Sequence, residues 1–287
     1  MINADEEQEA APTSDQRVVE YYTSHYDEGE RLTHSHNRLE FVRTCELLRD
    51  LLPLTSKPGP NAQAPVKVLD VGGGTGVYAA WLAADGYEVE LIDLVEAHVL
   101  QAQELSASLN HGFKARVGNT LALDVEDASQ DVCLLLGPLY HLPDAADRAK
   151  ALSEAVRVTR PGGLIVAATI SRYAWPLDEL RKGLLTSERA AMMREMLATG
   201  EHDAEKGFTT AYMHRPAELK EEFEKAGLVS VAVTGVEGPG WLLFTPELSE
   251  KEVERFLERA TLTARVCDGD MEIASASSHL LASGRRP

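Results

Sequence analysis

The sequence predicts an α/β protein built on a doubly wound parallel sheet. Apolar, β-branched segments of strand length alternate with segments of helical periodicity between residues 66 and 170. Residues 131–137, DVCLLLG, form a continuous apolar run, as expected of a strand that is covered on both faces. This alternation implies parallel strands joined by right-handed helical crossovers. Ligands of such sheets bind beyond the carboxyl ends of the strands, so functional residues are expected there.

Each element of the predicted core, residues 65–170, follows from its local pattern. The strands are expected at 66–71, 87–93, 113–117, 131–137 and 164–170, and the helices at 76–86, 96–109 and 144–159. The sequence Arg160-Pro161-Gly162-Gly163 should end the last helix, because proline and glycine favour a turn there.

The N-terminal flank is expected to contribute a tail and a lid. Residues 1–16 are polar and acidic, which is typical of a disordered tail. Residues 17–54 carry a helical pattern that Pro53 ends, and residues 55–65 are a Pro/Gly-rich linker. Residues 17–64 therefore form the predicted helical lid and its linker.

The C-terminal flank is expected to hold a cap and the rest of the sheet. Residues 171–214 interrupt the alternation with helical, Leu- and Met-rich patterns, and we interpret them as an inserted helical cap. Residues 215–287 return to the core; their predicted elements are helices at 216–227 and 249–266 and strands at 228–236 and 278–286. Ser249 and Glu252 have the spacing of a capping box at the start of the second helix.

Composition narrows the classes of partner. Hydrophobic residues make up 44% of the 287 residues and charged residues 26%, which suits a globular protein. The formal net charge of −18 disfavours nucleic acids and acidic membranes, because both are bound through Lys and Arg. The polar N-terminus lacks the apolar core of a signal peptide, and no apolar run is long enough to cross a bilayer. We expect a cytoplasmic protein that binds neither nucleic acid nor membrane.

The sequence contains no metal-binding or disulfide pattern. Cys45, Cys133 and Cys267 lie far apart, without a CxxC pair. His34 and His36 are separated by one residue in a polar segment, and we take this spacing as chance. No metal site is therefore predicted.

The sharpest motif is VLDVGGGTGVYAA, residues 68–80, in which a strand runs into a glycine-rich loop and a helix. Glycines there allow positive φ angles and bring backbone amides close to a ligand. The new helix offers free N–H groups to an anionic group such as a carboxylate. Asp70 ends the strand, where its carboxylate can hold the loop or face an ammonium group. Asp93 ends the next strand, and its two oxygens suit a ribose diol.

Together these features resemble the class I S-adenosylmethionine (SAM)-dependent methyltransferases. In that family a D-x-G-x-G-x-G loop, an acidic residue that ends the second strand, and an R-P-G-G turn occur together. The segments LLLGPLYHL (134–142) and GVEGPGW (235–241) are similar to a small-molecule subgroup related to ubiquinone and menaquinone methyltransferases. The resemblance implies a Rossmann-like, seven-stranded sheet and SAM as the cofactor.

The resemblance also assigns cofactor-binding positions. Gly72, Gly74 and Gly76 would line the methionine part of SAM, Asp70 would lie near its amino group, and Asp93 would accept hydrogen bonds from the ribose. The full expected set is Asp70, Gly72, Gly73, Gly74, Gly76, Asp93, Leu94, Asn119, Thr120, Leu136, Gly137 and Tyr140. Many members of the family have Asp where this chain has Asn119, so a charge is missing here but an acceptor for the adenine amine remains.

A dinucleotide site is the alternative interpretation of the loop. Gly74, Gly76 and Ala79 fit a permissive form of the nicotinamide-dinucleotide fingerprint, with Asp93 as the ribose acid. Asp70 and the GPLYHL and RPGG segments have no function in that interpretation, which is why we prefer SAM.

Three residues are candidates for catalysis. His141 follows the fourth strand at the ligand-binding edge and could act as a base near neutral pH, or else orient a loop. Tyr22 lies in the N-terminal helix, which covers the SAM site as a lid in the resembled group. His214, in the cap, is a second candidate base, with structure as its other role. Glu237, in the loop at 235–241, is expected either to bind a substrate cation or to stabilise its loop.

The predicted function is methyl transfer from SAM to an O, N, S or C nucleophile of a small molecule. The inserted cap favours enclosure of a small ligand. The segment Gly137-Pro138-Leu139-Tyr140 lacks the Asp or Asn and the Pro-Pro that nucleic-acid amino methyltransferases carry at this place. A protein or RNA methyltransferase and a non-catalytic SAM-binding protein are the rivals. The motifs select no particular substrate and no oligomeric state.

Overall fold

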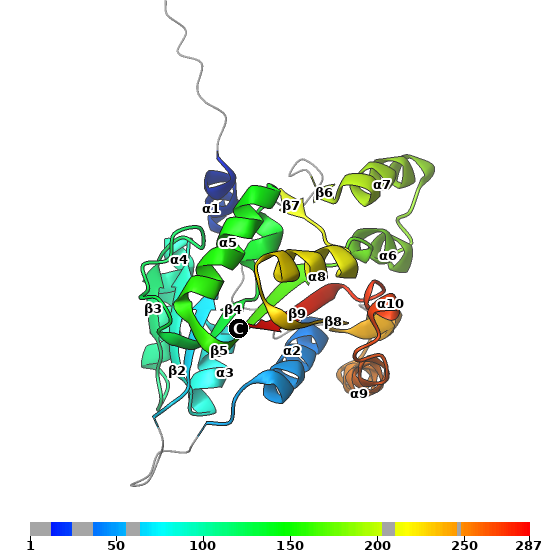
Figure 1. Cartoon of the computed structure of the whole chain (residues 1–287). Helices are drawn as coiled ribbons and strands as arrows, with labels where there is room; N and C mark the ends of the chain where they lie inside the picture. The colour runs from blue at the N-terminus through cyan, green and yellow to red at the C-terminus, as the bar shows by residue number, and fades with distance from the viewer. Residues whose placement is uncertain (1–12, 25–36, 56–63, 203–209, 246–247) are drawn as a thin grey trace, which may run out of the picture.

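A seven-stranded sheet runs through the centre of the molecule, with helices against both of its faces (Figure 1). The computed structural model describes residues 13–24, 37–55, 64–202, 210–245 and 248–287. The strand order is β3-β2-β1-β4-β5-β9-β8. The strands are β1 (Lys67–Val71), β2 (Glu88–Asp93), β3 (Lys114–Val117), β4 (Gln130–Leu135), β5 (Thr159–Ile170), β8 (Val229–Gly235) and β9 (His279–Arg285).

The two faces of the sheet carry separate apolar cores. Leu69 and Val71 of β1 pack toward α5 (Ala145–Val158), α8 (Pro216–Lys225) and α10 (Met271–Ala274). Val68 points the other way, toward α2 (Asn37–Leu51) and α3 (Val77–Ala84), and α4 (Glu96–Ala107) lies on this second face as well. This alternation is the two-residue period of a strand. The predicted doubly wound, Rossmann-like fold is confirmed.

The sheet departs from a purely parallel arrangement at one edge. Strands β1 to β5 pair in parallel, whereas β9 is antiparallel to both β5 and β8. Strand β9 is the last element of the chain, yet it lies inside the sheet between β5 and β8. Because its place depends on partners far away in sequence, no local pattern specifies it.

The predicted turn Arg160-Pro161-Gly162-Gly163 lies within β5, which begins already at Thr159. The pairing between β4 and β5 jumps from Gln130–Thr159 to Val132–Leu164, so this segment bulges out of the strand. Gly162 N–H donates to the Arg286 carbonyl at 2.8 Å, which ties the bulge to the end of the chain.

Two helices are described in the segment that the sequence predicted as a lid. Helix α1 spans Ser14–Ser24, so the tail predicted at 1–16 extends three residues too far. Helix α2 follows after residues 25–36, which lie outside the described residues, as do residues 1–12 and most of the linker, 56–63. His34 and His36 fall in the first of these gaps.

The inserted cap holds helices α6 (Ala174–Arg181) and α7 (Ser187–Thr199) and also a small sheet of β6 (Glu201–His202) and β7 (Ala211–Tyr212). A wholly helical cap was therefore the wrong expectation, because two-residue strands are too short to leave a periodic pattern. Helix α9 (Glu250–Val266) begins with the predicted capping box of Ser249 and Glu252. None of the described helices is both long and apolar enough to cross a membrane.

Candidate active site

The glycine loop after β1 is packed too tightly for larger residues. Gly72 and Gly74 have φ angles of 69° and 57°, in the left-handed region. A Cβ atom on Gly72 would lie 2.5 Å from Cγ of Pro138, and one on Gly73 would lie 2.7 Å from Oδ2 of Asp70. The loop thereby forms a close backbone wall between the ends of β1 and β4.

Gly76 lies at the start of α3, beside the glycine loop. It has a φ of 88° at the start of α3 and does not line the cavity beside the loop. A Cβ atom there would lie 2.7 Å from the ring of Phe113. Gly76 therefore lets α3 pack closely on its neighbours, and its placement does not support the predicted direct contact with the cofactor.

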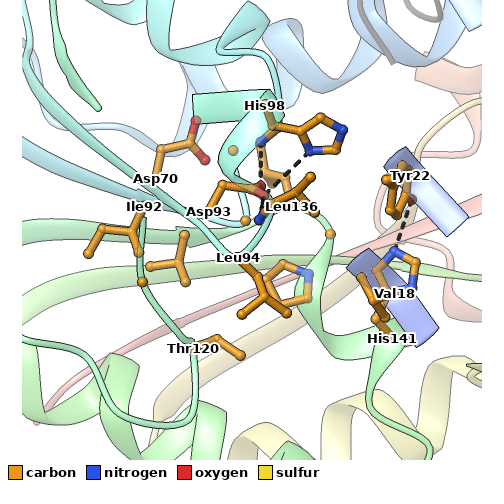
Figure 2. Close-up of a pocket in the computed structure, with 18 of the residues that line it drawn as sticks. Val18, Tyr22, Asp70, Ile92, Asp93, Leu94, His98, Thr120, Leu136 and His141 are labelled. Atoms are coloured by element: carbon orange, nitrogen blue, oxygen red, sulfur yellow. Dashed lines mark hydrogen bonds and ion pairs between the residues drawn. The ribbon is translucent and has the colours of Figure 1, made fainter. Parts of the chain in front are cut away.

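A cavity lies at the carboxyl ends of β1, β2 and β4, beneath α1 (Figure 2). It is lined by every predicted cofactor-binding residue except Gly76. Tyr22 and His141, two of the predicted catalytic residues, line it as well. The structure also adds residues that the sequence did not single out, above all Asp15 and Val18 of α1 and His98 of α4.

Several buried polar atoms face this cavity without a partner in the described structure. Asp70 is fully buried, and neither of its carboxylate oxygens has a hydrogen-bond partner. Burial raises the pKa of Asp70 to about 7, and the nearby Asp93 carboxylate adds to the increase. Thr120 Oγ1 and His98 Nε2 are likewise without partners. Buried polar groups are normally hydrogen-bonded, so the cavity suits a polar ligand with a cationic group near Asp70.

Asp93, the last residue of β2, holds the glycine loop that follows β1. Its Oδ2 accepts from Gly74 N–H at 2.8 Å and its Oδ1 from Val95 N–H at 2.8 Å. His98 Nδ1 lies 3.4 Å from Oδ1. Each carboxylate oxygen retains acceptor capacity, which is compatible with the predicted ribose contact.

Asn119 joins the lid to the cavity wall. Its Oδ1 accepts from Leu121 N–H at 2.8 Å, and its Nδ2 donates to Oδ2 of Asp15 at 2.8 Å. Asp15 is 104 residues away in sequence and belongs to α1. The carboxylate that is missing at position 119 is thus present beside it, supplied by the lid.

Tyr22 and His141 form a hydrogen-bonded pair at the cavity. The Tyr22 hydroxyl and His141 Nε2 are 3.0 Å apart (Figure 2), and His141 ends the short 3-10 helix η2 (Pro138–His141). The Tyr22 ring also meets the His98 ring edge-on, with centroids 5.1 Å apart. Burial lowers the pKa of His141 to about 4, although the Asp93 carboxylate opposes the shift. The imidazole is therefore neutral at physiological pH.

His214 lies outside the cavity, in a polar cluster where the end of the cap meets α5 and α8. Its ring is fully buried, and Nε2 is 3.2 Å from Oε2 of Glu222. Burial lowers the pKa of His214, with the Glu222 carboxylate acting in the opposite direction. Arg148 binds the other oxygen of Glu222 at 2.8 Å and stacks on Tyr212. This placement does not support His214 as a catalytic base.

Comparison with known proteins gives the family. A methyltransferase domain model matches residues 69–167. A ubiquinone biosynthesis O-methyltransferase from Idiomarina loihiensis is 30% identical over 194 residues, which are 66% of this chain and 71% of that protein. The chain belongs to the class I SAM-dependent methyltransferases. An O-methyltransferase of the same name from Burkholderia pseudomallei is 30% identical over 193 residues, 66% of this chain and 76% of that protein.

Solved structures share the fold of this methyltransferase. A SAM-dependent methyltransferase from Thermotoga maritima, described as a possible histamine N-methyltransferase, has a TM-score of 0.58 and 17% identity, and the match covers 94% of this chain and 99% of that one. A phosphoethanolamine N-methyltransferase from Haemonchus contortus, bound to S-adenosylhomocysteine, has a TM-score of 0.55 and 14% identity over 96% of this chain and 61% of that one. The cofactor of this methyltransferase is SAM rather than a dinucleotide.

Proposed function

We propose that this enzyme methylates an oxygen nucleophile, a hydroxyl group, on a small and partly apolar molecule. One observation carries the proposal: the Tyr22–His141 pair lies in the same cavity as the unpartnered Asp70 carboxylate. A polar, proton-accepting pair is thereby close to the groups that suit the cofactor. The curated relatives named as ubiquinone O-methyltransferases support oxygen as the methylated atom.

The cavity residues divide into two groups in this proposal. Asp70 holds the ammonium group of SAM, and the backbone of Gly72 to Gly74 lies along its methionine part. Asp93 accepts from the ribose, with Asn119 and Thr120 near the base. A polar ligand in these places would satisfy the buried oxygens of Asp70 and Thr120.

SAM supplies a methyl group on a sulfonium centre, an electrophile that needs no further activation. The protein must hold the acceptor in line and exclude water. A hydroxyl oxygen becomes strongly acidic once it gains a methyl group. A neutral imidazole with a pKa of about 4 is therefore basic enough to take that proton as the new bond forms. His141 is the proposed proton acceptor, and Tyr22 orients it through the 3.0 Å contact.

The charge of the chain supports a small molecule over a nucleic acid. The net charge of −18 opposes binding to phosphates, and the lid residues Asp15 and Val18 narrow access to the cavity. An RNA or protein methyltransferase would need an open surface beside the cofactor.

The test is a labelled-methyl assay with SAM on two matched panels, one of phenols and catechols with apolar side chains and one of the corresponding amines. We expect label in the first panel. His141→Gln should lower kcat at least about 100-fold and Tyr22→Phe about 10-fold, the range of general acid–base contributions, while SAM affinity is kept. Tyr21→Phe, which removes a hydroxyl from the same helix outside the cavity, and His111→Gln are the matched controls.

Two outcomes would contradict the proposal. Label confined to the amine panel would overturn the oxygen assignment. Saturable SAM binding without transfer to any panel member, together with transfer to RNA or protein, would overturn the small-molecule acceptor.

A further inference from the structure

Glu40, Glu237 and His279 form a cluster at the carboxyl edge of the sheet, outside the cofactor cavity. One ligand atom from each residue lies within 4.8 Å of the other two. His279 Nδ1 is 2.6 Å from Oε1 of Glu237 and 3.9 Å from Oε2 of Glu40. Glu40 lies on α2, Glu237 follows β8 directly before the 3-10 helix η4 (Gly238–Leu243), and His279 begins β9. Helix α2 and strands β8 and β9 lie side by side in Figure 1.

The Glu237 carboxylate is held from behind by hydrogen bonds. Its Oε2 accepts from the Ser277 hydroxyl at 2.6 Å and from the His279 backbone N–H at 2.9 Å. Its Oε1 is hydrogen-bonded to Nδ1 of the His279 ring at 2.6 Å. In metal sites, outer hydrogen bonds of this kind orient the ligating carboxylates.

The other two ligands are also placed by the fold. The backbone of His279 pairs with Ile170 of β5, and its carbonyl accepts from Val236 N–H at 2.9 Å. Glu40 lies on α2, a helix anchored to the same region by Arg43 Nε, which donates to the Val236 carbonyl at 3.3 Å. The cluster is thus held by α2, by the start of β9 and by the buried connection that follows β8.

Burial and donor chemistry both favour a cation. Glu40 and Glu237 are only 8% and 3% exposed. Glu237 is paired with the His279 ring, so a cation bound between them would replace the proton that the two side chains share. Two carboxylate oxygens and one imidazole nitrogen are a donor set that suits Zn²⁺ and Mn²⁺.

We propose that Glu40, Glu237 and His279 bind a divalent transition cation, Zn²⁺ or Mn²⁺, at a site distinct from the SAM cavity. Strand β9 is two positions from β4 in the sheet, so the cation lies roughly 10 Å along the edge from the strand that precedes η2 and His141. Three protein ligands leave coordination positions open. An oxygen of the methyl acceptor can occupy one of them; this last point rests on the proposed function, whereas cation binding does not.

In the experiment, a chelator first removes bound metal from the full chain. The protein is then titrated with Mn²⁺, and the electron paramagnetic resonance signal of the free ion is followed. Wild type should bind one Mn²⁺ saturably, and Zn²⁺ should displace it. Glu40→Gln and His279→Gln should weaken binding at least about 100-fold, and Ser277→Ala about 10-fold, since outer-shell changes cost 10–100-fold. Asp50→Asn, an exposed acid on the same helix, and His111→Gln are the controls and should bind as wild type does.

A second measurement separates loss of ligands from loss of folding. Co²⁺ bound at the wild-type site should give a visible absorption band, which the Glu40→Gln variant should lack while its circular dichroism and SAM affinity stay unchanged. The proposal is overturned if wild type shows no saturable one-to-one binding of Mn²⁺ or Zn²⁺, or if the cluster variants bind as tightly as the controls. Cation binding in a protein that labels no hydroxyl substrate would leave this site standing and overturn the proposed function alone.

Discussion

Asp70→Asn should stabilise the SAM-free protein increasingly as the pH rises. The carboxyl has a native pKa of about 7, raised chiefly by burial, against about 3.9 in an unfolded chain. Between these two values the native state keeps a proton that the unfolded state releases. The free energy of unfolding therefore falls with increasing pH across this interval.

The magnitude follows from the two pKa values. The Asp70 carboxyl destabilises the native state by about 2 kcal/mol at pH 5 and by about 4 kcal/mol at pH 8, because each pKa unit is worth about 1.4 kcal/mol. An asparagine removes this dependence but buries an amide without a partner, at a constant cost of about 1–3 kcal/mol. The change with pH is therefore the diagnostic quantity: the stability difference between variant and wild type should grow by about 2–3 kcal/mol from pH 5 to pH 8.

The assay is urea unfolding of both proteins without SAM at pH 5, 6, 7 and 8, with the exposed Asp50→Asn as control. In the same preparations, SAM should bind Asp70→Asn about 10–100-fold more weakly, since a charge-assisted hydrogen bond contributes about 1.5–3 kcal/mol. Parallel stability curves for wild type and Asp70→Asn would refute the reasoning, because they would mean that the carboxyl titrates alike in both states.

Four further predictions concern Gly76, Asp15, His141 and Arg148. Gly76→Ala should lower the free energy of unfolding by about 2–4 kcal/mol, through its left-handed φ and the clash with Phe113, as chemical unfolding would measure. Asp15→Ala should raise the Kd for SAM about fivefold, the equivalent of one hydrogen bond, in a calorimetric titration; an unchanged Kd would show that the lid contact contributes nothing. Burial lowers the pKa of His141 in the native state to about 4, from about 6.5 in an unfolded chain. The free energy of unfolding of wild type should therefore fall by up to about 3 kcal/mol as the pH decreases from 6.5 to 4. His141→Gln should remove this decrease, as urea unfolding at these pH values would measure. Arg148→Met should lower the free energy of unfolding by about 3 kcal/mol, because it removes the buried guanidinium that pairs with the Glu222 carboxylate. In the same variant kcat should fall by a larger factor than the affinity for SAM.

Local patterns were sufficient for most of the fold and for one half of the site. Strands β1, β2 and β4 and the glycine loop are contiguous segments whose composition and periodicity specify their structure. Because parallel strands bring their carboxyl ends to one edge, Asp70, Asp93 and His141 could be placed near one another from sequence alone. In the structure these three residues line one cavity, together with Tyr22 of α1.

The other half of the site depends on contacts that no local pattern records. Asp15 reaches Asn119 across 104 residues, and it lies where composition predicted only an acidic tail. His98 belongs to α4, whose sequence has an ordinary helical pattern. It is near Asp93 only because α4 packs beside the end of β2. Such residues become candidates once the tertiary arrangement is known.

His214 shows why position in a motif is a weaker guide than position in the fold. It follows β7 in the cap, and its backbone N–H donates to Ile170 of β5, which turns the ring into a cluster with Glu222 and Arg148. Arg148 in turn donates to the carbonyls of Leu142 and Pro143 at 2.9 and 2.8 Å, directly after His141. Through Glu222 and Arg148, His214 is linked to the segment that follows His141, although none of the described residues of the cap lines the cavity. His214 therefore belongs to the buried contacts that join the end of the cap to α8 and α5, which is a structural role.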